Sequence, residues 1–311
     1  MNNHLVKSEK NIVTRFAPSP TGKLHVGSAY AAVFAYSHAQ NSKNGQFLIR
    51  FEDIDRVRCS RDFESQILDD LSWLGIKSAR PIRRQSEHIL DYTKALRELK
   101  VRDLIYPCFC SRQDIRREIA SINIAPHQHT GLKYPGTCRH LSATEAQRRE
   151  LNGESFALRL NMDKALQNTK NLTWTDPYDR LHSFSPDIFG DVILARKDIP
   201  TSYHLAVTVD DHIQGINLVT RGEDLYETTA IHRLLQEILG YEAPQYLHHP
   251  LLLNQYGERF SKRNYGSTLT SLRKIGVSPN DLRDALSLEN NRQILDWIKT
   301  ADKKINKYKK Y

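Results

Sequence analysis

The chain has 311 residues, of which 39% are hydrophobic and 26% charged, and its mean hydropathy is −0.57. These values are typical of a globular protein and exclude a largely disordered one. No stretch approaches about eighteen consecutive apolar residues, and the first dozen residues lack the apolar core of a signal peptide. We therefore expect a cytoplasmic protein without a membrane partner. The net charge of +9 favours a polyanionic partner such as nucleic acid, although many basic proteins bind none specifically.

The first hundred residues alternate between apolar strands and amphipathic helices. The pattern predicts strands at Asn11–Phe16 and Gln46–Phe51, and helices at Gly27–Ala39, Asp62–Trp73 and His88–Lys100. Such alternation is typical of a parallel sheet with helices on both faces. We therefore expect an α/β fold with a Rossmann-like, doubly wound parallel sheet.

The pattern breaks between Tyr106 and Leu141, where Cys, Pro, Gly and His follow one another with little periodicity. This segment indicates an inserted, loop-rich module. The α/β pattern then resumes, with predicted strands at Ser155–Asn161 and Gly190–Arg196 and predicted helices at His204–His212 and Asp224–Leu239. From Leu269 onward we expect short helices only.

The segment Arg15-Phe-Ala-Pro-Ser-Pro-Thr-Gly-Lys-Leu-His-Val-Gly-Ser28 stands where the first strand leads into the first helix. Backbone N–H groups and the helix dipole favour anions at such a junction. The glycine spacing matches neither a Walker A loop nor GxGxxG. By themselves, His25 and Gly27 also fit a packed helix start and a simple turn.

As a string of letters, the segment closely resembles the first signature of class I aminoacyl-tRNA synthetases, the HIGH motif, here His25, Val26, Gly27 and Ser28. The preceding RFAPSPTG, Arg15 to Gly22, is characteristic of the glutamyl branch of that family. The resemblance implies an ATP site in which His25 faces the phosphates and Gly27 lets the adenine approach the backbone. It implies that Mg²⁺ accompanies the ATP.

A second basic stretch resembles the other signature of the family, KMSKS, in altered form. It comprises Arg259, Phe260, Ser261, Lys262 and Arg263. The resemblance places Lys262 on the leaving phosphates, so that His25, Gly27 and Lys262 together would carry the chemistry. Arg259 keeps the charge of the lysine that it replaces but changes its geometry. A basic loop of this length can also be merely a solvated surface.

The same resemblance supplies residues that would select L-glutamate. It carries Arg15, Ala17, Ser19, Glu52, Tyr203 and Arg221 onto the contacts of the family with its amino acid. A dicarboxylic amino acid offers two anions and one cation, to which two arginines, a carboxylate and a tyrosine are complementary. Alternatively, the acidic residues Glu52, Asp53 and Asp55 form a simple strand end or bind a metal, and Glu223 and Asp224 cap the helix that follows.

The four cysteines are too few and too unevenly spread for a disulfide framework, and three of them, Cys108, Cys110 and Cys138, lie in the loop-rich segment. They suggest a metal site, although the CxC spacing is unusual for zinc. Tyr134 and three histidines, His127, His129 and His140, compete as fourth ligand. Resemblance to the glutamyl-queuosine tRNA(Asp) synthetases, which share the CxC…YxxxC arrangement, favours structural zinc held by Cys108, Cys110, Tyr134 and Cys138.

Only about fifty residues follow the Lys262 loop, whereas glutamyl-tRNA synthetases continue with a helical anticodon-binding region. The resemblance therefore indicates the shorter paralogue, which activates glutamate without tRNA and transfers it to queuosine in the anticodon loop of tRNA(Asp). Two alternatives stay open: a truncated glutamyl-tRNA synthetase that charges a tRNA 3′ end, and a non-catalytic RNA-binding relic. We expect a monomer.

The expected division of the chain follows from the motifs and the break in pattern. Residues 1–105 form the first half of the catalytic domain, and residues 106–141 the zinc-binding insert. Residues 142–265 complete the insert and supply the second half of the catalytic domain with its KMSKS-like loop. Residues 266–311 form a short helical region with a basic tail.

Overall fold

A computed structural model describes residues 11–121, 133–167, 169, 172–252, 268–287, 294, 296–298 and 300. Two parallel sheets occupy its centre. One has the order β1-β2-β3, with β1 at Val13–Phe16, β2 at Gln46–Phe51 and β3 at Arg83–Arg84, and the other pairs β9 (Leu218–Gly222) with β10 (Gln245–His249). The sheets meet where β1 contacts β9, since the backbone N–H of Asn217 donates to the carbonyl of Val13 at 3.1 Å.

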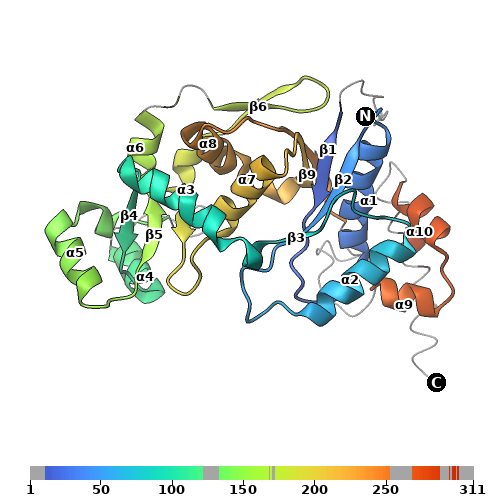
Figure 1. Cartoon of the computed structure of the whole chain (residues 1–311), viewed down its shortest axis with the longest axis horizontal. Coiled ribbons are helices and arrows are strands. Elements are labelled where there is room, and N and C mark those ends of the chain that lie inside the picture. The colour runs from blue at the N-terminus through green and yellow to red at the C-terminus, as the bar shows by residue number, and fades with distance from the viewer. Residues whose placement is uncertain are drawn as a thin grey trace.

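Side chains alternate across β2, and this alternation builds two layers of core. Phe47, Ile49 and Phe51 pack into one cluster with the first helix, whereas Leu48 joins Val219 on the opposite face. The helices whose residues share the first cluster are α1 (Val26–Gln40), α2 (Arg61–Trp73), α9 (Leu269–Lys274) and α10 (Pro279–Leu286). The expected α/β class with a parallel sheet is therefore confirmed (Figure 1).

A second core lies beside the parallel strands. It packs three helices, α3 (Ile89–Val101), α7 (Tyr203–Ile213) and α8 (Thr229–Leu239), against an antiparallel sheet of β4 (Ile105–Cys108), β5 (Ala157–Leu160) and β8 (Ile193–Ala195). In Figure 1 this antiparallel sheet lies at the end of the molecule opposite α9 and α10. Because β4, β5 and β8 all fall between β3 and β9 in the chain, this sheet interrupts the parallel strands in sequence.

The structure corrects two expectations about secondary structure. The segment after Tyr106 is not only loop, because it contains α4 (Arg112–Ser121) and the short helix η2 (Thr137–His140). The helix expected at Asp224–Leu239 divides into η4 (Glu223–Leu225) and α8, whose N-cap is Thr228, so Glu223 and Asp224 do not cap it. The remaining elements are η1 (Gln85–Glu87), α5 (Ala143–Leu151), α6 (Met162–Gln167), the hairpin β6 (Thr173–Thr175) with β7 (Leu181–Ser183), and η3 (Pro186–Phe189).

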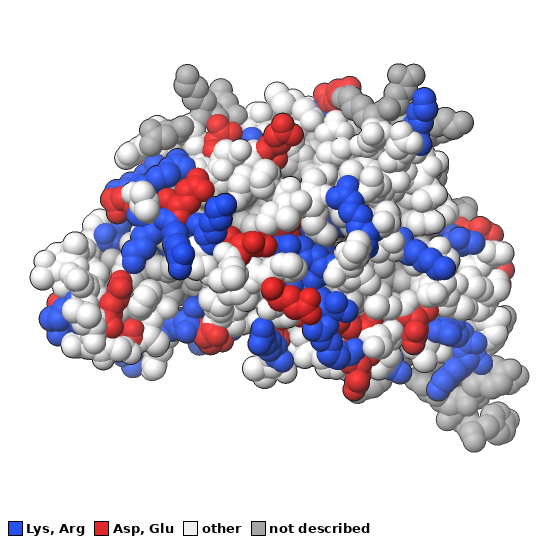
Figure 2. Space-filling view, viewed as in Figure 1, with Lys and Arg blue, Asp and Glu red and all other residues white. Residues whose placement is uncertain are grey.

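None of the helices in the described ranges is long and apolar enough to cross a membrane. The basic stretch Arg259–Arg263 and the histidines His127 and His129 lie outside the described residues. On the face shown in Figure 2, lysines and arginines are interspersed with aspartates and glutamates.

Candidate active site

The start of α1 is built around His25. His25 is the N-cap, and its Nδ1 accepts a hydrogen bond from the backbone N–H of Ser28 at 3.2 Å. Val26 is fully buried in the first turn, so the end of the helix is anchored in the core. Since the first N–H groups of a helix favour anions, this end of α1 suits a phosphate, as the sequence predicts.

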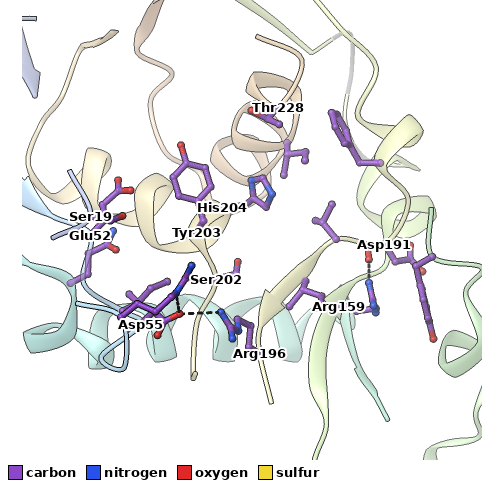
Figure 3. Close-up of a pocket in the computed structure, with 18 of the residues that line it drawn as sticks. Ser19, Glu52, Asp55, Arg159, Asp191, Arg196, Ser202, Tyr203, His204 and Thr228 are labelled. Carbon is purple, nitrogen blue, oxygen red and sulfur yellow. Dashed lines mark hydrogen bonds and ion pairs between the residues drawn. The ribbon is translucent and has the colours of Figure 1, made fainter. Parts of the chain in front are cut away.

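A cavity of about 730 Å³ opens beside this junction. One end is lined by Ser19 and Glu52, and the other by Arg159 and Asp191, with Tyr203 between them in Figure 3. Asp55 and Arg196 approach each other across the cavity wall at 3.9 Å. The cavity therefore extends well beyond the residues that were predicted to contact glutamate.

Glu52 and Tyr203 lie at the end of the cavity where the pKa values of side chains are raised. Burial raises the pKa of Glu52 to about 7, although Arg50 and Arg15 act in the opposite direction. Burial and the nearby Glu52 also raise the pKa of the Tyr203 phenol, against Arg221 and Arg15. The four predicted residues Arg15, Glu52, Tyr203 and Arg221 are thus close enough to act on one another electrostatically.

Beneath this end lies a buried network of paired charges. Arg15 donates from Nε to Asp211 at 2.9 Å, and Arg50 donates from Nη1 to the same carboxylate oxygen at 2.7 Å. Burial alone would raise the pKa of Asp211, but the two guanidinium groups lower it below its ordinary value. Asp210 accepts from Arg83 at 2.7 Å and from the Tyr92 hydroxyl at 3.0 Å. Helix α7 is therefore tied to β1, β2 and β3 by ion pairs.

Arg221, at the end of β9, has a different environment. It is 7% exposed, and its guanidinium donates to His232 Nδ1 at 2.8 Å, to His248 Nε2 at 3.3 Å and to the hydroxyl of Thr229. Among the described residues, no carboxylate lies within ion-pairing distance of it. A buried cation with only neutral partners is costly unless an anion joins it.

The three cysteines of the insert and Tyr134 come together as the sequence predicts. The Sγ atoms of Cys108, Cys110 and Cys138 lie within 4.8 Å of one another, and this is the one group of His, Cys, Asp or Glu in the described part of the chain that could hold a metal ion. The Tyr134 hydroxyl oxygen is 3.4 Å from the Cys108 sulfur and 3.6 Å from the Cys110 sulfur.

The distances given above are within about 0.4 Å of the edges of a coordination tetrahedron. Bonds of about 2.3 Å to sulfur and about 2.0 Å to oxygen require ligand atoms about 3.5–3.8 Å apart, and the Cys110 and Cys138 sulfurs are 3.4 Å apart. His140 is exposed, whereas Tyr134 is 6% exposed and faces the sulfurs. The side chains present therefore fit a metal ion with a phenolic fourth ligand.

The cysteine cluster and the cavity share a wall. Tyr134 lines the cavity, and the Arg159 guanidinium lies 3.8 Å from the centre of its ring. Arg159 also donates to the backbone carbonyl of Asp191 at 2.7 Å.

Most of the predicted amino-acid contacts lie together, and the HIGH-like motif lies at a helix start. The structure brings together Arg15, Glu52, Tyr203 and Arg221, with Ser19 on the cavity wall, and it places His25, Val26, Gly27 and Ser28 at the start of α1. Ala17 follows β1 directly. The acidic residues after Glu52 do not form a metal site, since Asp53 accepts from the Ser86 backbone at 2.8 Å and Asp55 from Arg58 at 2.7 Å.

The sequence did not predict which side chains are hydrogen-bonded or ion-paired to Arg15 and Arg221. Arg50 stands two residues before Glu52, and a charged residue inside an apolar strand was the available signal for it. His204, His232 and His248 gave no comparable signal, because they come from three separate elements. Asp210 and Asp211 fell within a predicted helix, without any indication that they face the sheet.

Comparisons with known proteins agree with this geometry. A family model described as the catalytic domain of class I tRNA synthetases for E and Q matches residues 11–298. The chain is 44% identical over 286 residues to a glutamyl-Q tRNA(Asp) synthetase of Rhodobacter capsulatus, covering 89% of this chain and 100% of that relative. It is 35% identical to a glutamate–tRNA ligase of Hydrogenobaculum, covering 88% of this chain but 57% of that relative.

A solved structure shows the same fold. The glutamate tRNA ligase of Elizabethkingia meningosepticum, determined in complex with its amino acid, superposes with a TM-score of 0.69 at 26% identity, covering 83% of this chain and 54% of that one. The parallel sheet, the HIGH-like helix start and the adjoining cavity define a ligase of the class I aminoacyl-tRNA synthetase type. The chain belongs to the E and Q family of these synthetases, and its relatives include several glutamyl-Q tRNA(Asp) synthetases.

Proposed function

We propose that the protein activates L-glutamate with ATP without needing tRNA, and transfers the glutamyl group to queuosine in the anticodon loop of tRNA(Asp). The environment of Arg221 is the main observation in support of glutamate as the substrate. Its guanidinium is buried with neutral partners, near Tyr203, and it lacks an anionic partner that a glutamate carboxylate would supply.

The amino-acid end is complementary to glutamate in charge. Three of the N–H groups of Arg221 are engaged, one on each nitrogen, which leaves one N–H on each terminal nitrogen for a carboxylate. Glu52 can hold the α-ammonium group when it is ionised. Arg15, which is paired with Asp211, adds positive potential near Glu52. Ala17 and Ser19 lie on the loop that leaves β1 and would complete the contacts with glutamate.

In the first step, an oxygen of the glutamate α-carboxylate attacks the α-phosphorus of ATP. A P–O bond forms, the bond to pyrophosphate breaks, and glutamyl-adenylate results. Because positioning and charge stabilisation dominate such transfers, the helix start with His25 and Gly27 would orient the phosphates. Lys262, within Arg259, Phe260, Ser261 and Arg263, would hold the leaving pyrophosphate. Mg²⁺ would enter with the ATP.

In the second step, a queuosine hydroxyl attacks the activated carbonyl. An ester forms, AMP leaves, and the proton of the hydroxyl is released to solvent. The size of the cavity supports an acceptor of this kind, since volumes of roughly 300–1,000 Å³ accommodate drug-sized ligands and glutamate is much smaller. Similarity to a glutamyl-Q tRNA(Asp) synthetase along the whole length of that relative supports the same acceptor.

The decisive assay for activation is glutamate-dependent ATP–pyrophosphate exchange without tRNA. We expect exchange with glutamate and at least about tenfold less with glutamine, which lacks the second carboxylate. Absence of exchange by folded, metal-loaded protein would sink the proposal. Arg148→Gln is a suitable control, because this exposed arginine forms its ion pair with Glu145 on its own helix, and we expect the substitution to leave exchange unchanged.

The acceptor is tested with labelled glutamate and tRNA(Asp) that contains or lacks queuosine. We expect label only on the queuosine-containing RNA and, after nuclease digestion, in the anticodon-loop fragment rather than in the 3′-terminal fragment. Label on the terminal adenosine would instead support a truncated glutamyl-tRNA synthetase. Absence of transfer by the wild-type protein, with RNA binding unchanged in His25→Ala and Lys262→Ala, would support a non-catalytic role for this chain.

The cysteine cluster is proposed to hold structural zinc through Cys108, Cys110, Tyr134 and Cys138. When bound, zinc would cross-link the end of β4 to the segment around η2. We expect about one zinc per chain by elemental analysis, and a loss of metal affinity of at least about tenfold in Cys138→Ser. Cys59→Ser is the matched control, because Cys59 lies outside the cluster. Unchanged zinc affinity in Tyr134→Phe would exclude the phenol as a ligand.

A further inference from the structure

Two histidines beside the cavity, which the proposed chemistry does not use, extend a hydrogen-bonded chain from Arg221. Arg221 Nη1 lies 2.8 Å from His232 Nδ1, and His232 Nε2 lies 3.1 Å from His204 Nδ1. His232, at 2% exposure, is one of the most enclosed polar residues of the described structure. The chain thus runs from the proposed glutamate carboxylate partner to a residue of the cavity wall.

The chemistry of arginine determines where the protons lie. A guanidinium can only donate, so His232 Nδ1 must accept and carry no proton. A neutral imidazole has one N–H, which therefore sits on His232 Nε2 and donates to His204 Nδ1. His204 must then carry its own proton on Nε2. The opposite direction would leave His232 without any ring proton.

Both imidazoles are neutral in the free protein. Burial, and then the nearby Arg221, lower the pKa of His204 to about 4 and that of His232 well below its ordinary value. The tautomers are therefore set by hydrogen bonding rather than by protonation.

His204 presents this proton to the cavity. It stands in the first turn of α7, after the N-cap Ser202, and both residues line the cavity. No hydrogen-bond partner for its Nε2 is present among the described residues. In Figure 3 Tyr203 lies between Glu52 and His204, so His204 is on the side of the cavity away from the proposed ammonium site.

We propose that His204 is a hydrogen-bond donor to the acceptor nucleoside, with His232 as the positioning residue that holds it in the Nε2–H tautomer. Its partner is an oxygen of the hydroxyl-bearing part of the acceptor. This inference rests on the proposed function, since it names a contact made in the transfer step. While the chain is intact, His204 Nε2 cannot remove a proton from the attacking hydroxyl.

The tautomers can be measured directly. Long-range proton–nitrogen NMR of histidine-labelled protein should show Nε2–H for both His204 and His232. In Arg221→Met the donor that fixes His232 is gone, and the Nε2–H population of both rings should fall. An Nδ1–H tautomer of His204 in the wild-type protein would overturn the inference.

The functional test compares transfer with exchange in the same preparations. A single lost hydrogen bond corresponds to roughly three- to tenfold in rate. In His204→Phe we expect the kcat/KM for queuosine-containing tRNA(Asp) to fall by about that factor more than the kcat/KM for glutamate in exchange. His204→Gln, which keeps an amide N–H near the position of Nε2, should recover most of the difference.

His232→Phe tests the positioning role of His232 separately from the contact that His204 would make with the acceptor. It should reduce transfer about as much as His204→Phe, while also raising the KM for glutamate a few-fold, because Arg221 loses a partner. Equal losses of transfer and exchange in His204→Phe, or no loss of transfer, would refute the role of His204. Failure of the wild-type protein to exchange or to transfer would instead refute the proposed function.

Discussion

Two buried arginines that the sequence predicts for the same task, Arg15 and Arg221, lie in opposite electrostatic surroundings. Arg15 shares Asp211 with Arg50, within a network that ties α7 to the first sheet. Arg221 donates to His232, to His248 and to a threonine hydroxyl. No carboxylate of the described residues lies within ion-pairing distance of it. The charge of Arg15 is neutralised by a carboxylate of the protein, whereas the charge of Arg221 is available to an anionic ligand.

The contrast separates stability from binding. A charge pair buried inside the protein contributes to folding only while both members are present. A buried cation that lacks a counter-ion costs folding free energy, which binding of an anion can recover. We therefore expect substitutions in the Asp211 network to weaken the fold, and substitutions of Arg221 to weaken glutamate binding.

The largest expected effect is on stability in Asp211→Asn. Loss of this carboxylate leaves Arg15 and Arg50 without a shared anion, and removing one member of a buried pair costs about 3–5 kcal/mol. Urea denaturation should show the free energy of unfolding reduced by that amount. The control is Asp198→Asn, since Asp198 is exposed and, within the described ranges, its ion pair is with Arg196, two residues away. A loss below about 1 kcal/mol would remove the distinction between the two arginines.

The next effect is on binding in Arg221→Met. Charged hydrogen bonds contribute about 1.5–3 kcal/mol each, so loss of the two that Arg221 would make should lower glutamate affinity, measured by calorimetry, at least about a hundredfold. Stability should stay within about 1 kcal/mol of the wild type, because an uncompensated cation is removed together with its three neutral contacts. Arg221→Lys should recover little affinity, since lysine keeps the charge but not the planar fork. A large loss of stability with unchanged affinity would reverse our assignment.

The smallest effect is a pH dependence at Glu52. Its pKa is raised to about 7 by burial, so the carboxylate that would hold the α-ammonium is increasingly protonated below that pH. The KM for glutamate in exchange should rise roughly fivefold from pH 7 to 6, and about tenfold per unit below. In Glu52→Gln the KM should be high and lack this dependence.

The raised pKa also has a stability consequence of definite sign. The folded protein keeps the Glu52 proton up to pH about 7, whereas an unfolded chain loses it near its ordinary value of 4.5. The contribution of this carboxyl to stability is therefore fully present below the ordinary value and is lost as pH rises through this interval. Glu52→Gln should be less sensitive to pH there, as thermal unfolding at several pH values can show.

Much of the first half of the fold was predictable from sequence. The apolar run of β2 and the periodicity of α2 and α3 gave elements whose bounds agree within one residue, because β2 is buried on both faces and each helix buries one regular face. The strands β9 and β10 were missed. Each has five residues, and β9 ends in the charged run that begins at Arg221, so neither offers a long apolar signal.

The residues of the site were predictable from the sequence, but the side chains that pair with them were not. Resemblance could assign Arg15, Glu52 and Arg221 to glutamate, because the matching motifs are contiguous. It could not show that one arginine is paired and the other is not, since Asp211 is 196 residues from Arg15 in the chain. Likewise, the helix α4 was missed because its arginine-rich sequence follows a cysteine-rich turn, and the side chains from Arg112 to Arg117 are largely exposed.

The position of the antiparallel sheet in the chain has a practical consequence for protein engineering. Tyr134, Arg159 and Asp191, at the far end of the cavity, all come from the stretch between β4 and β8, whereas Ser19 and Glu52 come from before it and Tyr203 from after it. Replacing that stretch with its counterpart from a glutamate–tRNA ligase would exchange one half of the cavity and leave the other native. Such chimaeras could redirect activated glutamate to new hydroxyl acceptors without redesigning the activation chemistry.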